Sequence, residues 1–230
     1  MDMVISQYDA EYLHLLIRYR KALLQRNVLL RKETEPDSDF IGVYETEMAG
    51  SGEFIYRKRK EFVAEFMPIF RQIYAQLACA DENVELIYQS HCEESPLLKI
   101  LQDNRAKDRV MGFSLMGVHR DDLDMKLNGF PIKREGSQGQ NKTFMISMKL
   151  AQFNFLKGKG NSHVPILLLD DIFDKLDERR VEQIVDMVSG NRFGQIFITD
   201  TNRDFLASVL GHTGKDYRMF NVKAGEVTLI

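Results

Sequence analysis

The chain has 230 residues, of which 44% are hydrophobic and 28% are charged, so a folded chain with a substantial core is expected and global disorder is excluded. The 31 basic and 34 acidic residues give a net charge of −3, which excludes a protein that coats nucleic acid through bulk positive charge but allows a local basic patch. Apolar runs stay shorter than the roughly 18 residues of a membrane span and the N-terminus does not resemble a signal peptide, so we expect a cytoplasmic protein.

The first third of the chain predicts a hairpin of two long helices. Apolar residues recur at steps of three and four from about residue 10 to residue 31. After Pro36 a second helical period begins at Ile41 and continues to Leu77 without a change of phase. We therefore predict a second long helix with a weak or kinked turn near Gly50, packed antiparallel on the first.

Short elements follow this hairpin. "VELIYQS" alternates as a strand does, and residues 96 to 109 form a polar stretch that we interpret as helical. "LDMKLNGFPIK" places Asn128 and Gly129 where a two-residue primed turn is needed. It predicts a β-hairpin that returns through Phe130 and Ile132.

The last third alternates helices and strands. We predict a helix over 138–157, a buried strand "PILLLD", a helix over 178–189 closed by Gly190, a strand "QIFIT", and a C-terminal hairpin "MFNVKAGEVTLI". Fully apolar strands separated by a helix are typical of parallel pairing. The expected fold class is α/β, with a helical arm over residues 1–82 and a sheet-containing part over 83–230.

The strand "PILLLD" ends in two aspartates, Asp170 and Asp171, at the edge of the sheet where open α/β sheets bind ligands. A magnesium ion on a nucleotide needs one or two carboxylates, and a hydrolytic water needs a carboxylate beside it. Asp170 is the candidate metal ligand and Asp171 the candidate catalytic residue. The alternative is that the pair only ends the strand and caps the next helix.

The loop "GSQGQNKT" has two interpretations. Ser137 can cap the helix that begins at Gln138, and Gly139 allows a bulky anion to approach the backbone. The exposed amides of a helix N-terminus also favour negative charge. The loop is either an ordinary helix cap or a phosphate-binding turn.

Two further clusters have structural alternatives of equal or greater weight. The run Arg57, Lys58, Arg59 and Lys60 is a candidate for contacts with DNA phosphates, but it also suits the solvated face of a helix. "HRDD" at residues 119–122 resembles a catalytic cluster. We favour a polar corner there, because the neighbouring sequence offers no nucleophile.

The loop "GSQGQNKT", the strand "ILLLDDIFDKLD", "QIFITDT", "GVHRDDLDMKLNGFPIK" and "YLHLLIRYRKALLQRNVLLR" together resemble the C-terminal part of the RecF family of bacterial repair ATPases, which belongs to the ATP-binding-cassette (ABC) superfamily. The resemblance implies a partial ABC-type ATPase head with a parallel sheet core, flanking helices and β-hairpins, joined to the helical arm. It assigns the magnesium ligand to Asp170 and the hydrolytic carboxylate to Asp171. The dimer-crossing D-loop acid corresponds to Asp177. The signature residues, which contact ATP held by the other subunit, correspond to Ser137, Gln138, Gly139 and Gln140.

The same resemblance implies ATP and Mg²⁺ as cofactors and a homodimer in the ATP state. It further implies DNA junctions or gaps and recombination mediators of the RecO/RecR type as partners, with no membrane. The 230 residues contain no GxxxxGK[ST] phosphate loop, and "GHTGKDY" does not satisfy that pattern. We therefore expect a fragment that alone neither binds ATP tightly nor hydrolyses it.

Two alternatives remain open for the function. The first is a non-enzymatic interaction or DNA-binding module, or a split subunit that needs a separate lobe carrying the phosphate loop. The second is a transporter-type cassette subunit, which is less favoured because a long helical hairpin precedes the signature loop and "SQGQ" departs from the transporter pattern.

Overall fold

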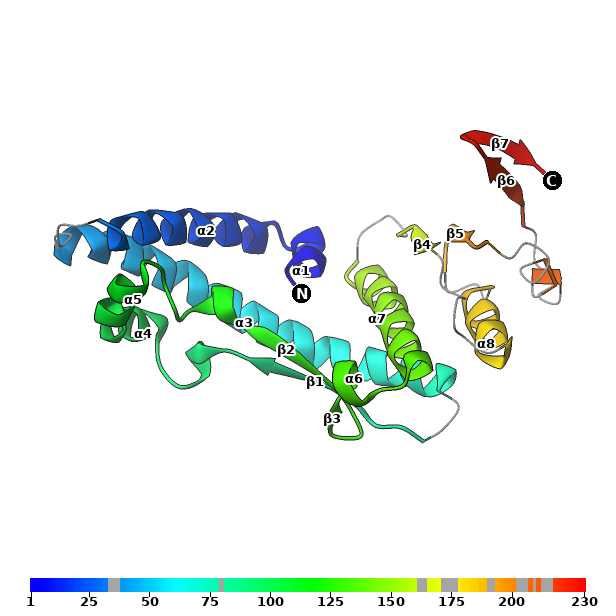
Figure 1. Ribbon diagram of the computed structural model, residues 1–230, viewed down its shortest axis with the longest axis horizontal. Helices are drawn as coiled ribbons and strands as arrows, with labels where there is room; N and C mark the ends of the chain where they lie inside the picture. Colours follow the sequence, from blue (N-terminus) through cyan, green and yellow to red (C-terminus); the bar gives the residue numbers. More distant parts are fainter. Residues whose placement is uncertain are drawn as a thin grey trace.

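The computed structural model describes residues 1–32, 38–78, 81–160, 165–170, 178–189, 193–201, 207–208, 210–211 and 217–230. Its N-terminal part is an elongated arm made by α2 (Ala10–Leu30) and α3 (Ser38–Leu77), which run antiparallel as predicted (Figure 1). A short helix that the periodicity did not predict, α1 (Asp2–Tyr8), precedes them. Asp9 ends α1 and starts α2, because its side chain accepts a hydrogen bond of 2.9 Å from the backbone N–H of Tyr12.

The helix α3 continues through residues 50–52, so the weak turn predicted near Gly50 is wrong. Gly52 instead allows close packing, because a Cβ atom there would lie 2.3 Å from Cδ2 of Leu97 and 3.2 Å from Cε2 of Tyr19. Leu97 begins α4 (Leu97–Asp103), which is followed by α5 (Arg105–Met111). A glycine inside this helix therefore marks a contact between helices.

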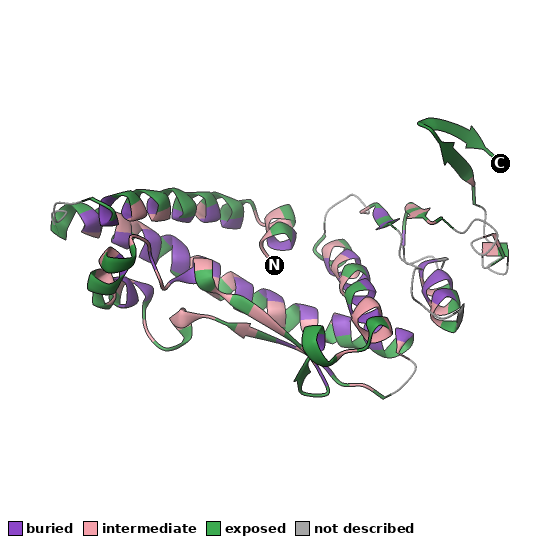
Figure 2. Ribbon diagram, viewed as in Figure 1, coloured by how far each residue is buried: buried purple, intermediate pink, exposed green. Residues whose placement is uncertain are grey.

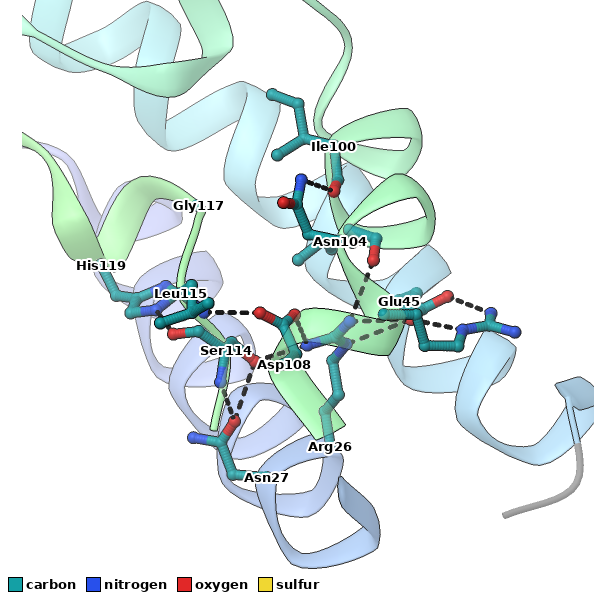
Figure 3. A network of polar contacts seen from close by, with 12 residues as sticks. Arg26, Asn27, Glu45, Ile100, Asn104, Asp108, Ser114, Leu115, Gly117 and His119 are labelled. Atoms are coloured by element: carbon teal, nitrogen blue, oxygen red, sulfur yellow. Dashed lines mark hydrogen bonds and ion pairs between the residues drawn. The ribbon is translucent and has the colours of Figure 1, made fainter. Parts of the chain in front are cut away.

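A buried arginine connects the two arm helices to α5 (Figure 3). The Arg26 side chain is fully buried and its guanidinium contacts Glu45 at 3.0 Å, Asp108 at 2.7 Å and the Ser114 hydroxyl at 2.7 Å. It also donates to the backbone carbonyl of Leu101 at 3.0 Å. A buried charge is tolerated only when it is paired in this way, so these contacts fix the position of α5 on the arm.

An antiparallel sheet lies along α3 in the order β1 (Val84–Gln89), β2 (Asp122–Leu127), β3 (Phe130–Pro131). The segment between β1 and β2 also contains the short turns η1 (His91–Glu93) and η2 (Val118–Arg120). Asn128 and Gly129 have φ angles of 52° and 81°, which confirms the predicted primed turn.

The return strand of this hairpin is shorter than predicted. Ile132 does not continue β3 but begins α6 (Ile132–Glu135). Pro131 has no N–H to extend the ladder, and its φ of −58° suits the start of a helix. The buried Ile132 side chain joins the main core.

The helix α7 (Gln138–Gly158) packs across α3 and is followed by β4 (Leu167–Asp170), α8 (Glu178–Ser189) and β5 (Ile196–Thr199). β4 and β5 pair in parallel, as predicted, and the register places Asp170 opposite Thr199. The strand is not buried on both sides, however, because Leu167 and Leu169 are buried while Leu168 is 65% exposed. In the part of the chain that is described, only one face of this pair joins the core.

The C-terminal hairpin consists of β6 (Phe220–Lys223) and β7 (Glu226–Leu229), joined through Ala224 and Gly225 in left-handed conformations. It confirms the predicted hairpin. Every residue of both strands is exposed (Figure 2).

The main hydrophobic core runs through the arm and the neighbouring elements, and a smaller cluster contains Leu29, Leu30 and Ile41. The centre of the main core is aromatic: Phe70 lies edge-on to Phe144 of α7, and Phe62 and Phe66 lie edge-on to Phe155. The core crosses residue 82, and the division into parts 1–82 and 83–230 stays a prediction. Among the described residues, the helices are too polar or too short to cross a membrane.

Candidate nucleotide site

The first turn of α7 is a capping box, as the loop "GSQGQNKT" predicts. The Ser137 hydroxyl accepts a hydrogen bond of 3.2 Å from the backbone N–H of Gln140, and the Gln140 side-chain oxygen accepts one of 2.8 Å from the Ser137 N–H. Ser137 and Gln138 are exposed. The first amides of a helix have no partner within it and favour negative charge, and the contact of this turn with a phosphate stays a prediction.

Gly139 has a function that its sequence pattern does not indicate. A Cβ atom on this residue would lie 2.7 Å from a terminal guanidinium nitrogen of Arg180, which comes from α8. The glycine therefore allows a cation to lie against the first turn of α7. The positive helix terminus and this guanidinium together favour negative charge.

Asp170 lies at the carboxyl end of β4, where its carboxylate is exposed and accepts a hydrogen bond from the Thr199 hydroxyl on β5. Asp171 and Asp177 lie outside the described residues. Within those residues, His, Cys, Asp and Glu side chains do not form a group of three that holds a metal ion. A magnesium ion on a nucleotide needs only one or two protein carboxylates, with phosphate and water completing its shell. The exposed Asp170 carboxylate, oriented by the Thr199 hydroxyl, could serve as one such ligand.

The two candidate regions lie apart. The N-terminal turn of α7 is beside α6, whereas β4 lies beyond the other end of α7 (Figure 1). One copy of the chain therefore does not place Ser137 next to Asp170.

The basic run on α3 separates into exposed and buried side chains. Arg59 is buried, and its guanidinium contacts Asp2 at 2.9 Å and Asp121 at 2.7 Å. These carboxylates occupy the guanidinium, so Arg59 is not accessible to a phosphate.

The other three cations of this run reach the surface. Arg57 lies 4.0 Å from Glu61 and has a side chain that is 62% exposed. Lys58 pairs with Asp9 and Lys60 with Glu93. For Arg57, Lys58 and Lys60 the contact with DNA stays a prediction.

His119 belongs to a polar corner. Its Nε2 lies 3.1 Å from the backbone carbonyl of Ser114, which can only accept, so Nε2 carries the hydrogen. The Tyr19 hydroxyl then donates to Nδ1 over 2.8 Å. Burial lowers the pKa of His119. Asp121 contacts Arg59 and accepts from the Tyr88 hydroxyl. Both ring nitrogens of the histidine are used structurally, which favours the non-catalytic interpretation.

No family model matches the chain. The DNA replication and repair protein RecF of Phocaeicola vulgatus is 58% identical over 228 residues, which is 99% of this chain and 62% of the relative. RecF of Bacteroides fragilis is 55% identical over 99% of the chain and 61% of the relative. The chain belongs to the RecF family. It spans about three fifths of the length of the RecF relatives it matches.

The RecF fold extends over the whole chain. The solved structure of the recombination mediator protein RecF-ATPrS in the RecFOR pathway covers 100% of the chain and 61% of its own length, with a TM-score of 0.82 and 25% identity. The predicted fold class is therefore confirmed, as part of a RecF head with a parallel strand pair and a helical arm. The sequence patterns did not reveal Thr199 or Arg180, because each meets its partner only after folding.

Proposed function

We propose that this chain is part of a RecF-type protein that acts in DNA replication, recombination and repair by binding DNA as an ATP-dependent dimer. The observation that carries the proposal is the 58% identity to a DNA replication and repair protein over 99% of the chain. In this proposal the protein acts in the cytoplasm on DNA junctions or gaps. It helps to load recombination proteins at gaps, together with mediators of the RecO/RecR type.

The proposed nucleotide contact is made in trans. Ser137, Gln138, Gly139 and Gln140 would contact the γ-phosphate of an ATP molecule bound to the other subunit. Three features support this role: the exposed first turn of α7, the Arg180 guanidinium beside it, and its separation from β4. Association then depends on nucleotide because the phosphate contributes negative charge that this surface favours.

Asp170 would hold Mg²⁺, and Asp171 would position or deprotonate the hydrolytic water. When bound, Mg²⁺ neutralises charge that develops on the phosphates. The Thr199 hydroxyl holds the Asp170 carboxylate in one orientation. Asp177 would cross to the other subunit as the D-loop acid. Because the 230 residues contain no phosphate loop, we propose that ATP binding and hydrolysis require a lobe that carries one.

A split subunit or non-enzymatic interaction module is the second candidate. The observation behind it is the capping box of the signature turn, which is complete within this chain and which the chain would contribute to a lobe supplied separately. In that case the chain would bind a separate phosphate-loop lobe and contribute Ser137 to it without hydrolysing ATP alone. ATPase measurements on the chain mixed with a phosphate-loop lobe separate a non-enzymatic module from the first candidate, because only the first candidate predicts hydrolysis in the mixture.

Substitutions of Ser137 separate the roles of cap and phosphate contact. Asp caps helices as well as Ser does, but its charge repels a phosphate. In a RecF-type protein that contains this chain and a phosphate loop, Ser137→Asp should abolish ATP-dependent dimerisation in analytical ultracentrifugation while the thermal stability stays unchanged. Ser137→Thr, which retains cap and hydroxyl, is the matched control. Normal ATP-dependent dimerisation of Ser137→Asp would refute the contact in trans.

A further inference from the structure

A row of hydrogen bonds connects the signature turn to the arm. The Gln140 side-chain nitrogen donates to one carboxylate oxygen of Glu82 over 2.7 Å. The other Glu82 oxygen accepts from the Tyr74 hydroxyl over 2.6 Å. Since the Gln140 oxygen accepts from the Ser137 N–H over 2.8 Å, the row runs from Ser137 on α7 to Tyr74 on α3 without a gap.

Both ends of this row are held in place. The Tyr74 ring is 1% exposed and packs against Phe70 of its own helix and Phe144 of α7. Burial and the bond to Glu82 raise the pKa of Tyr74, so its hydroxyl remains a donor. The amide of Gln140 has one workable orientation, because a flip would set its NH₂ group against the Ser137 N–H and its oxygen against the carboxylate.

We propose that Glu82 is a positioning residue that couples the α3 arm to Ser137. Its carboxylate is the shared acceptor between the two helices, so a displacement of Tyr74 along α3 pulls on Gln140 and thereby on the cap. This role rests on the proposed contact of Ser137 with a nucleotide in trans. By linkage, a partner that shifts the arm would change the affinity for that nucleotide, and the nucleotide would change the affinity for the partner by the same factor.

The chemistry of the three groups selects the informative variants. Glu82→Ala removes both bonds. Glu82→Gln retains both, because the new amide oxygen accepts from Gln140 while its NH₂ group donates to the oxygen of Tyr74. Tyr74→Phe breaks only the connection to the arm. Glu85 is a carboxylate three residues further along that bonds to Asn83, so Glu85→Ala is the matched control.

The first experiment uses the chain alone and measures amide hydrogen exchange. Glu82→Ala should accelerate exchange of the Gln140 and Asn141 amides, which donate to Ser137, about fivefold, because the cap loses its support. Glu82→Gln and Glu85→Ala should leave these amides as in the wild type. Unchanged exchange in Glu82→Ala would overturn the positioning role, whatever the function of the protein.

The second experiment uses a RecF-type protein that contains this chain and a phosphate loop, and measures the ATP concentration at half-maximal dimerisation. Glu82→Ala should raise it about tenfold and Tyr74→Phe about threefold, with Glu82→Gln close to the wild type. If Ser137→Asp abolishes dimerisation while Glu82→Ala does not affect it, the coupling is refuted and the contact in trans stands. If Ser137→Asp also has no effect, the proposed function fails and the coupling fails with it.

Discussion

The guanidinium of Arg26 on α2 lies 2.7 Å from the carboxylate of Asp108 on α5, and at most 1% of either side chain is exposed. Arg26→Leu would leave Asp108 and Glu45 buried without this cation. Breaking a buried ion pair from one side costs about 3–5 kcal/mol, so the free energy of unfolding should fall by that amount. Urea denaturation measures it.

The control for this prediction is Arg18→Leu. Arg18 pairs with Glu47 at 2.6 Å, but its side chain is 49% exposed. The loss there should stay below about 1 kcal/mol. Equal losses in the two variants would mean that the burial of Arg26 does not determine its contribution.

Substitution by alanine should lower the stability of the protein at Gly52 and raise it at Gly50. At Gly52 the new methyl group would lie 2.3 Å from the buried Leu97 side chain, and overpacking of this kind costs about 1–3 kcal/mol. At Gly50 nothing lies within 4 Å, so alanine should stabilise the helix by about 0.5–1 kcal/mol. Thermal unfolding of the two single variants should therefore shift in opposite directions, and a shift in the same direction would contradict the packing described for α4.

His119 should make stability depend on pH. Burial lowers its pKa below the value near 6.5 of the unfolded chain. Between the folded pKa and pH 6.5, the unfolded state binds more protons than the folded state. The stabilisation by neutral His119 is therefore complete above pH 6.5 and is lost as the pH falls through the folded pKa. The stability difference between wild type and His119→Gln should shrink between pH 7.5 and pH 5.5.

Urea denaturation across that range tests this prediction. The slope attributable to one histidine is at most about 1.4 kcal/mol per pH unit. His14→Gln, at an exposed position of α2, controls for the loss of an imidazole. A difference that stays constant with pH would show that His119 does not control the titration.

The exposed cations of α3 are predicted to contact DNA phosphates. Each phosphate contact contributes about 0.9 to the slope of log K against log salt concentration. Arg57→Ala combined with Lys60→Ala should reduce the magnitude of that slope by up to about 1.8. The change is measured by fluorescence anisotropy with gapped DNA at several salt concentrations, using a RecF-type protein that contains this chain and a phosphate loop, with ATP.

Lys149→Ala combined with Lys223→Ala removes the same charge from exposed positions on α7 and β6. This control should retain the slope of the wild type. If both double variants lower the slope equally, binding depends on net charge and the α3 surface is not the DNA contact.

Thr199 should set the affinity of Asp170 for magnesium. Groups that orient a metal ligand typically change metal affinity by 10–100-fold when they are removed. In a RecF-type protein with a phosphate loop, Thr199→Val should raise the Mg²⁺ concentration needed for half-maximal ATP hydrolysis about tenfold. Thr199→Ser, which retains the hydroxyl, should resemble the wild type. An unchanged requirement in Thr199→Val would exclude this role.

Local periodicity predicted the long helices and the primed turn well, because these elements depend on residues close in the chain. Ser137 was predictable as a cap for the same reason, since Gln140 completes the box three residues later. The charge pattern of α3 was less informative, because it did not distinguish buried from exposed cations. Arg59 is in a basic run, yet its partners Asp2 and Asp121 are 57 and 62 residues away. No local pattern contains that information.

The sequence did not predict the contacts of the candidate site for the same reason. Glu82 is 58 residues from Gln140, and Thr199 is 29 residues from Asp170. The strand pattern of β4 correctly predicted parallel pairing but overestimated burial. An apolar residue indicates only that burial of its side chain would be favourable. It does not indicate whether another element in the described part of the chain packs against that side chain.

The uneven burial of β4 and β5 affects how the chain behaves in solution. Ile166, Leu168 and Phe197 present an apolar surface, with exposed fractions of 58%, 65% and 48%. Contiguous apolar surface of this kind promotes contact with other molecules. The solubility of a purified sample should therefore depend on protein concentration, detergent and salt.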